Sequence, residues 1–205
     1  MIKARFSDQD DLTIWKSFKG GNREAFAYMY DKHVKLLFLY GKKISDDIDL
    51  IEDCIHDTFV EIWTSRSQLS ETDSIKRYLF KILRRKITKA VQSKYKTQNV
   101  GNQHDLKRIV DELTKEESMI RQDVNAERYV IVRESLRLLT NRQREILYLR
   151  YFEGLDYEEI ADIIDINLQS AKNIVHRALV KIREQLSKEK ISKLLIFLLF
   201  VLSSF

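Results

Sequence analysis

The chain has 205 residues, of which 33% are charged, with five Gly and no Pro. This length is enough for one or two small domains, and the single Cys54 excludes an internal disulfide and a four-cysteine zinc site. The formal net charge of +5 is small, so the distribution of charge matters more than its sum. Long stretches follow the helical period and none alternates convincingly, which predicts an all-α fold.

The first predicted elements are helices between about residues 11 and 95. The segment GGNREAFAYMYDKHVKLLFLYGKKI opens with a Gly pair and continues with apolar residues at helical spacing. Further helices are predicted over about 46–63 and 75–94. The polar stretch SRSQLSETDS between them is a predicted loop, with Ser70 and Thr72 as candidate helix caps.

The predicted helix over 46–63 has one apolar side and one acidic side. The apolar residues at spacings of three and four are Ile48, Ile51, Ile55, Phe59 and Ile62. The acidic residues at intervals of four are Asp49, Asp53, Asp57 and Glu61, here called the acidic face. Like charges at this spacing repel one another. The acidic face is therefore either a plain solvated surface or a docking face for a basic partner, with Trp63 and Phe59 as aromatic anchors.

The next predicted helix has the opposite charge. From Lys76 to Lys96 there are nine Lys or Arg and no Asp or Glu. Its buried side is predicted to contain Leu79, Leu83, Ile87 and Ala90, and Tyr78 and Phe80 lie near its start. Cationic side chains neutralise phosphates and aromatic rings stack on unpaired bases, which favours single-stranded nucleic acid over an acidic lipid or an acidic protein as the partner.

A polar segment separates this helix from the next helical zone. TQNVGNQHD is typical of a linker, and residues 98–127 include seven acidic and four basic residues. Helical patterning resumes at about residue 126.

The segment EEIADIIDINLQSAKNIVHRALVKIRE predicts two short helices joined by a tight turn. The first covers about 157–164, the turn is Asp165 to Asn167, and Asn167 is a candidate N-cap for the second helix. The inward residues of the second helix are Ala171, Ile174, Val175, Ala178 and Ile182. Its outward residues are polar or basic, as a helix that reads a DNA major groove requires. An ordinary helical hairpin is the alternative.

The two ends of the chain differ. The N-terminus lacks the apolar core of a secretory signal. The C-terminal run LLIFLLFVL is strongly apolar, but residues 191–205 would span only about 22 Å as a helix, short of the roughly 30 Å hydrocarbon core. This tail is expected to pack on the chain's own surface, with the membrane or a membrane-bound regulator as alternative contacts.

Taken together, the segments DCIHDTFVEIW, SIKRYLFKILRRKI and LTNRQREILYLRYFEGLDYEEIADIIDINLQSAKNIVHRALVKIRE resemble bacterial RNA polymerase sigma factors of the extracytoplasmic-function type. The resemblance covers nearly everything from Asp11 to Leu186, and NLQSAKNIVHRAL with the apolar tail is more similar to the branch typical of Bacteroidetes-type bacteria. It implies a region 2-like helical domain over 8–96, an acidic-biased linker over 97–125, a region 4-like helix-turn-helix domain over 126–188 and an apolar tail over 189–205.

The resemblance also implies partners: core RNA polymerase, promoter DNA and, where one exists, an anti-sigma factor at the membrane. The residues implied to dock on the polymerase clamp helices are Asp49, Asp53, Asp57, Phe59, Glu61 and Trp63. Those implied to open and hold the minus-ten element are Arg66, Arg77, Tyr78, Lys81, Arg84, Arg85 and Lys89. Those implied to read the minus-thirty-five element are Gln169, Ser170, Lys172, Asn173, His176, Arg177 and Lys181.

The chain departs from many relatives at three positions, with Arg85 where Asn is common, Asp165 where Gly is frequent and Ile174 where a basic residue is common. No phosphate loop, nucleophile–base pair or metal cluster stands out in the sequence. We therefore expect a cytoplasmic initiation factor that has no enzymatic activity and needs no cofactor. The alternatives are a stand-alone helix-turn-helix regulator, which binds as a dimer, and a membrane-surface protein.

Overall fold

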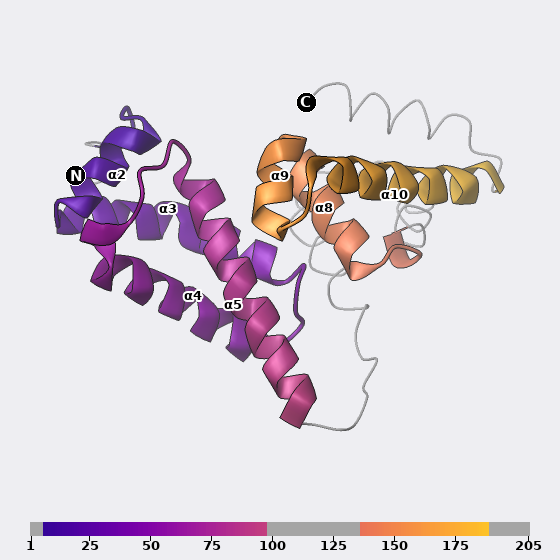
Figure 1. Cartoon of the computed structure of the whole chain (residues 1–205), viewed down its shortest axis with the longest axis horizontal. Helices are drawn as coiled ribbons and strands as arrows, with labels where there is room; N and C mark the ends of the chain where they lie inside the picture. Colours follow the sequence, from indigo (N-terminus) through magenta and orange to yellow (C-terminus); the bar gives the residue numbers. More distant parts are fainter. Residues whose placement is uncertain (1–5, 98–135, 189–205) are drawn as a thin grey trace, which may run out of the picture. The chain divides into compact units, whose positions relative to one another are not determined.

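The computed structural model describes residues 6–97 and 136–188, and every regular element within these ranges is helical. The predicted all-α fold is therefore confirmed. The chain divides into two units, Met1–Val100 and Gly101–Phe205 (Figure 1). The predictions for the linker and for the apolar tail fall on residues outside the described ranges.

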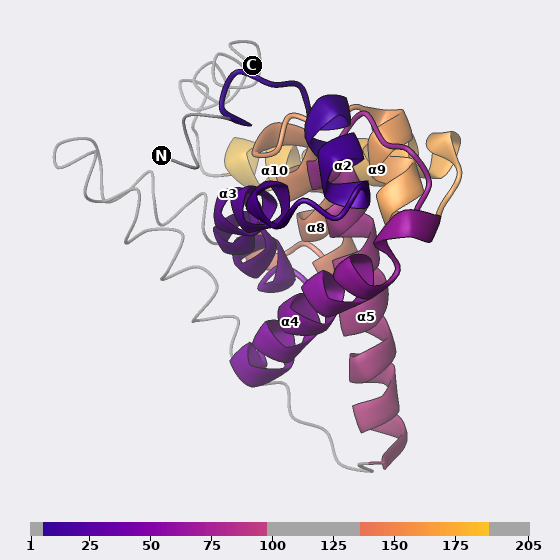
Figure 2. The same cartoon turned by 90° about the vertical axis from the view of Figure 1, so that its left-hand side faces the viewer.

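In the first unit, α5 crosses the other helices and packs against α2, α3 and α4 (Figures 1 and 2). The elements of this unit are α2 (Asp11–Lys19), α3 (Arg23–Gly41), α4 (Ile48–Thr64), the short 3-10 helix η1 (Arg66–Gln68) and α5 (Ile75–Thr97). Within residues 6–97, a single core is formed by the apolar sides of these helices.

Short polar side chains fix where the helices of the first unit begin. Asp10, Asn22 and Asp47 accept hydrogen bonds from the first-turn N–H groups of α2, α3 and α4. The prediction that Ser70 or Thr72 caps α5 is wrong. Ser74 takes this role, because its hydroxyl accepts from the Arg77 N–H at 3.3 Å, while the Thr72 hydroxyl accepts from the N–H of Ser74.

The helices of the first unit approach closely at Gly41. A Cβ at this position would lie 2.6 Å from Ile51 Cγ2 and 3.3 Å from Ile87 Cδ1, so the crossing of α3 with α4 and α5 leaves no room for a methyl group. Ile51 and Ile87 are fully buried as predicted. Ile48 is not part of this core: at 39% exposure it lies at the start of α4, at the surface, where Leu50 is buried instead.

The second unit contains α8 (Asn141–Tyr151), α9 (Tyr157–Ile164) and α10 (Leu168–Lys188). Capping boxes start α8 at Thr140 with Gln143, and α9 at Asp156 with Glu159. The core of this unit combines apolar residues from all three helices, Ile146, Leu149, Ile160, Ile164, Val175 and Ala178. The helix bounds and the Asn167 cap agree with the helix-turn-helix prediction, because Asn167 Oδ1 accepts from the Ser170 N–H at 2.7 Å.

No helix within residues 6–97 and 136–188 combines the length and the apolar character needed to cross a membrane.

One polar side chain in the first core has no hydrogen-bond partner within the described residues. The imidazole of His33 on α3 is 3% exposed, and neither of its ring nitrogens is paired. Burial, reinforced by the charge of Lys32, lowers the pKa of His33 from 6.5 to about 4. His33 is therefore neutral in the folded protein near pH 7.

The lowered pKa of His33 predicts a loss of stability in acid. Because the unfolded chain binds this proton at a higher pH than the folded chain, the contribution is complete above pH 6.5 and is lost as pH falls towards 4. We expect the free energy of unfolding of the wild type to fall by about 3 kcal/mol more than that of His33→Leu over this range. Urea unfolding at several pH values measures this difference, and parallel pH profiles for the two proteins would contradict it.

Candidate functional site

Most of the acidic face lies in solvent on α4. Asp49, Asp53 and Asp57 are exposed. Glu61, at the end of the face nearest to η1, is half-buried and lies 2.7 Å from Lys86 Nζ and 3.3 Å from Arg85 Nη2. The acidic face is therefore divided: Glu61 is paired with α5, whereas the other three carboxylates point outwards.

Phe59, a predicted docking residue, is almost fully buried in the core and borders the hollow between Tyr30 and Trp63. Its ring is 3% exposed and packs against Tyr30 at 4.8 Å and Phe26 at 6.0 Å between ring centroids. Phe59 belongs to the core because the helical period turns it inwards, although it is only two residues from Glu61. Trp63 is half-exposed, so of the two predicted aromatic anchors only Trp63 reaches the surface.

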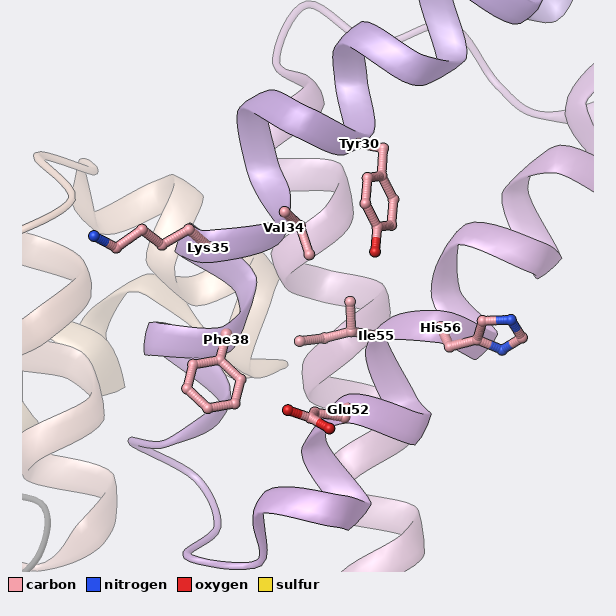
Figure 3. Close-up of a pocket in the computed structure, with 7 residues that line it drawn as sticks. All are labelled: Tyr30, Val34, Lys35, Phe38, Glu52, Ile55 and His56. Atoms are coloured by element: carbon pink, nitrogen blue, oxygen red, sulfur yellow. The ribbon is translucent and has the colours of Figure 1, made fainter.

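A groove that was not predicted from the sequence runs between α3 and α4 beside the acidic face, and its lining is mixed in one part and mostly apolar in the other. Figure 3 shows Tyr30, Val34 and Phe38 on α3 opposite Ile55 and Glu52 on α4, with Lys35 extending away. This hollow measures about 380 Å³, and a second hollow of about 270 Å³ shares Tyr30 and His56 with it and continues to Trp63.

Two large apolar residues at this groove are unusually exposed, Tyr30 at 42% and Val60 at 46%. The sequence contained an indication of this exposure for Val60. Val60 lies on the outer side of α4 among the carboxylates, where a plain solvated face would have a polar residue.

Helix α5 presents most of its predicted basic residues at the surface. Lys81, Arg85 and Lys89 are exposed, and Arg77 and Arg84 are half-buried. Tyr78 is also half-buried, because its ring packs against Trp15 with 4.8 Å between the centroids, and burial raises the pKa of its phenol. Phe80, the other aromatic residue near the start of the helix, is in the core and stacks on Tyr40.

Arg66 lies apart from α5 and is held by α4. Its guanidinium lies 4.5 Å from the centroid of the Trp63 ring, and Nη1 donates to the Trp63 carbonyl oxygen at 2.7 Å. This geometry combines a cation–π contact with a hydrogen bond. Arg66 therefore marks the point where the loop after α4 leaves the helix.

The outer side of α10 is polar and basic, as the sequence predicted. Six of the seven predicted residues are exposed, and the seventh, Ser170, is half-buried. The Gln169 side chain donates to Asn173 Oδ1 at 3.0 Å, so these two amides form one polar patch near the start of the helix. Amide and basic groups of this kind can contact base edges and phosphates in a major groove.

The turn before α10 explains one departure from the related sequences. Asp165 adopts a left-handed conformation, with φ 54° and ψ 61°, and its N–H donates to the Ala161 carbonyl oxygen. Glycine is favoured in this conformation, and Asp is one of the few other residues that adopt it readily. The substitution therefore leaves the turn intact. Ile174, which was predicted to point inwards, is half-buried.

The described residues contain no group of three or more His, Cys, Asp or Glu side chains placed to bind a metal ion. Cys54 is buried on α4, and burial raises the pKa of its thiol. A protonated, buried thiol is a poor nucleophile.

Comparisons with known proteins agree with the two units. The family model described as "Sigma-70 region 2" matches residues 29–97, and the model described as "Sigma-70, region 4" matches residues 129–182. The chain is 28% identical over 158 residues to the RNA polymerase sigma factor SigV of Bacillus subtilis, with 77% of this chain and 86% of SigV covered. It is 24% identical over 178 residues to the ECF RNA polymerase sigma factor SigK of Mycobacterium tuberculosis, with 86% and 92% covered.

Two solved structures share the fold. The structure of CnrH in complex with the cytosolic domain of CnrY matches with a TM-score of 0.57 at 18% identity, and covers 87% of this chain and 97% of the other. The sigma factor RpoE from Bartonella quintana, solved with the anti-sigma factor NepR, matches with a TM-score of 0.50 at 20% identity, and covers 77% and 98%. The suggested Bacteroidetes-type branch remains a prediction.

The division of the acidic face predicts different effects on stability. Replacing Glu61 by Gln removes the charge that Arg85 and Lys86 face, so we expect the free energy of unfolding to fall by up to about 1 kcal/mol at low salt. Replacing the exposed Asp53 by Asn relieves repulsion along α4 and is expected to leave stability unchanged or raise it by a few tenths of a kcal/mol. Urea unfolding monitored by circular dichroism measures both, and equal losses would show that the division is wrong.

Proposed function

Because the chain belongs to the sigma-70 family, as an RNA polymerase sigma factor of the extracytoplasmic-function type, we propose a specific role for each of its surfaces in transcription initiation. A sigma factor binds core RNA polymerase, directs it to promoters and helps to open the DNA. The observation that carries the assignment is that regions 2 and 4 match in this order, each on its own helical unit.

We propose that the exposed part of the acidic face, Asp49, Asp53 and Asp57, docks on a basic surface of core RNA polymerase, with Trp63 as the aromatic anchor. Two observations support this. The α4 helix keeps exposed carboxylates at intervals of four residues although like charges at this spacing repel one another, and a partly apolar groove lies alongside them. Charge gives orientation and speed of association, while apolar area gives affinity. Phe59 and Glu61 would act indirectly, by holding α4 in place.

The basic side of α5 is proposed to hold the non-template strand of the minus-ten element. The exposed cations Lys81, Arg85 and Lys89 would neutralise phosphates along the helix, and Arg77 and Arg84 would add to this field. Tyr78 and Arg66 present the planar groups nearest to the loop, where stacking on an unpaired base is favourable. Capture of unpaired bases would stabilise open DNA without hydrolysis of a nucleotide.

Helix α10 is proposed to read the minus-thirty-five element as duplex DNA. Gln169 and Asn173 are suited to base edges, and Lys172, His176, Arg177 and Lys181 to phosphates or guanine. A protein with these activities would work in the cytoplasm, without a cofactor and without enzymatic activity.

An anti-sigma factor is a further proposed partner. The support is indirect, because the RpoE structure that shares this fold contains an anti-sigma factor. Such a partner would inhibit by covering surfaces that the polymerase needs.

Charge reversal tests the docking proposal. Asp53→Lys combined with Asp57→Lys is expected to abolish binding to core polymerase in the absence of DNA, because two attractive charges become repulsive. Glu158→Lys with Asp162→Lys is the matched control, since it reverses two exposed carboxylates at the same spacing on α9. Competition with a labelled sigma factor measures binding. Retained binding by the α4 variant, with helical content unchanged, would refute the docking role.

Removal of charge from α10 tests the DNA-reading proposal. Lys172→Ala with Arg177→Ala should weaken use of promoters that need the upstream element, each contact contributing about 1–3 kcal/mol. Lys16→Ala with Arg23→Ala removes two exposed cations from the first unit and serves as the control. Run-off transcription with core enzyme measures the effect. Tight, specific DNA binding by the isolated chain would instead favour a stand-alone regulator.

A further inference from the structure

Helix α2 is tied to the loop between α4 and α5 along one side. Asp11, Trp15 and Lys19 are spaced by four residues, so they form a single stripe on the helix. The Trp15 indole N–H donates to the Ser70 carbonyl oxygen at 2.9 Å, and Lys19 Nζ lies 2.9 Å from Glu71 Oε1. The three residues of this stripe precede residue 29, where the region 2 match begins, and their partners Ser70 and Glu71 lie in the loop.

Asp11 connects the same stripe to the start of α5. Its Oδ2 accepts from the Ile75 N–H at 2.8 Å, while Oδ1 lies 3.4 Å from Lys32 Nζ. The first N–H groups of a helix have no partner within the helix. At the start of α5, the Ser74 hydroxyl accepts from the Arg77 N–H. The carboxylate of Asp11, which belongs to α2, accepts from a second N–H, that of Ile75. The position of the first turn of α5 therefore depends on α2.

Trp15 also reaches the first aromatic residue of the basic helix. It is fully buried, and its ring packs against that of Tyr78 with 4.8 Å between the centroids. A buried indole N–H needs an acceptor, and here the acceptor is a carbonyl group of the loop. The other end of the loop is fixed by Arg66, which stacks on Trp63. The segment 65–75 is thus held at one end by α4 and at the other by α2.

We propose that Asp11 and Trp15 are positioning residues for promoter opening. They hold the segment 65–75 and the start of α5 in the arrangement that captures unpaired non-template bases. This segment therefore loses little conformational entropy when the strands separate. Lys19 contributes less, because its partner Glu71 is exposed. The inference rests on the proposed function, since it assigns a supporting role to α2 in that same process.

The test compares two templates with the intact chain and core RNA polymerase. One is a duplex promoter, and the other carries mismatches that open the minus-ten region in advance. Asp11→Ala and Trp15→Phe are expected to lower the yield of run-off transcript roughly tenfold on the duplex. On the mismatched template they should match the wild type. Asp47→Ala is the matched control, because Asp47 also caps a helix of this unit and pairs with a lysine, Lys94.

The possible results of this experiment distinguish a failure of the positioning role from a failure of the proposed function. Equal losses on both templates, or wild-type behaviour on both, would overturn the positioning role while leaving the sigma-factor function in place. A loss confined to the duplex that Asp47→Ala reproduces would also overturn it, because general destabilisation would then explain the effect. A wild-type chain that directs core polymerase on neither template would overturn the proposed function and the inference with it.

Discussion

The packing of α4 and α5 into one core is the constraint on which both candidate surfaces of the first unit depend. Each helix buries its apolar side, which leaves the carboxylates of α4 and the cations of α5 on outer sides of adjacent helices. They meet at Glu61, which faces Arg85 and Lys86, and at Asp47, which faces Lys94. Because exposed ion pairs add little stability, the apolar contacts hold the two helices together.

In the second unit, too, apolar packing decides which side chains lie at the surface, and here a turn adds to its effect. Its apolar residues fix α9 against α10, and the left-handed turn at Asp165 followed by the Asn167 cap sets where α10 begins. The start of the helix decides which side chains face outwards, because a shift of one residue would rotate the polar side by about 100°. The turn therefore sets which side of α10 is exposed, the side proposed to contact DNA.

Much of this could be predicted from the sequence, and the exceptions have physical reasons. Helix type and the bounds of α9 follow from periodicity and caps, which are local. The inward position of Phe59, the Ser74 cap and the pairing of Glu61 depend on neighbours that are distant in the sequence. The groove between α3 and α4 could not be predicted for the same reason, since neither helix forms it alone. Contacts between helices, rather than the helices themselves, were the missing information.

The positions of the two tryptophans have a practical consequence. Trp15 and Trp63 are the only two in the chain, and both lie in the first unit, one buried beneath the loop and the other half-exposed beside Arg66. Tryptophan fluorescence of the intact protein, excited at a wavelength where tyrosine does not absorb, therefore originates in this unit alone. It is a label-free signal for the environment of the loop and of the anchor on α4, and it does not respond directly to the helix-turn-helix, whose aromatic residues are tyrosine and phenylalanine.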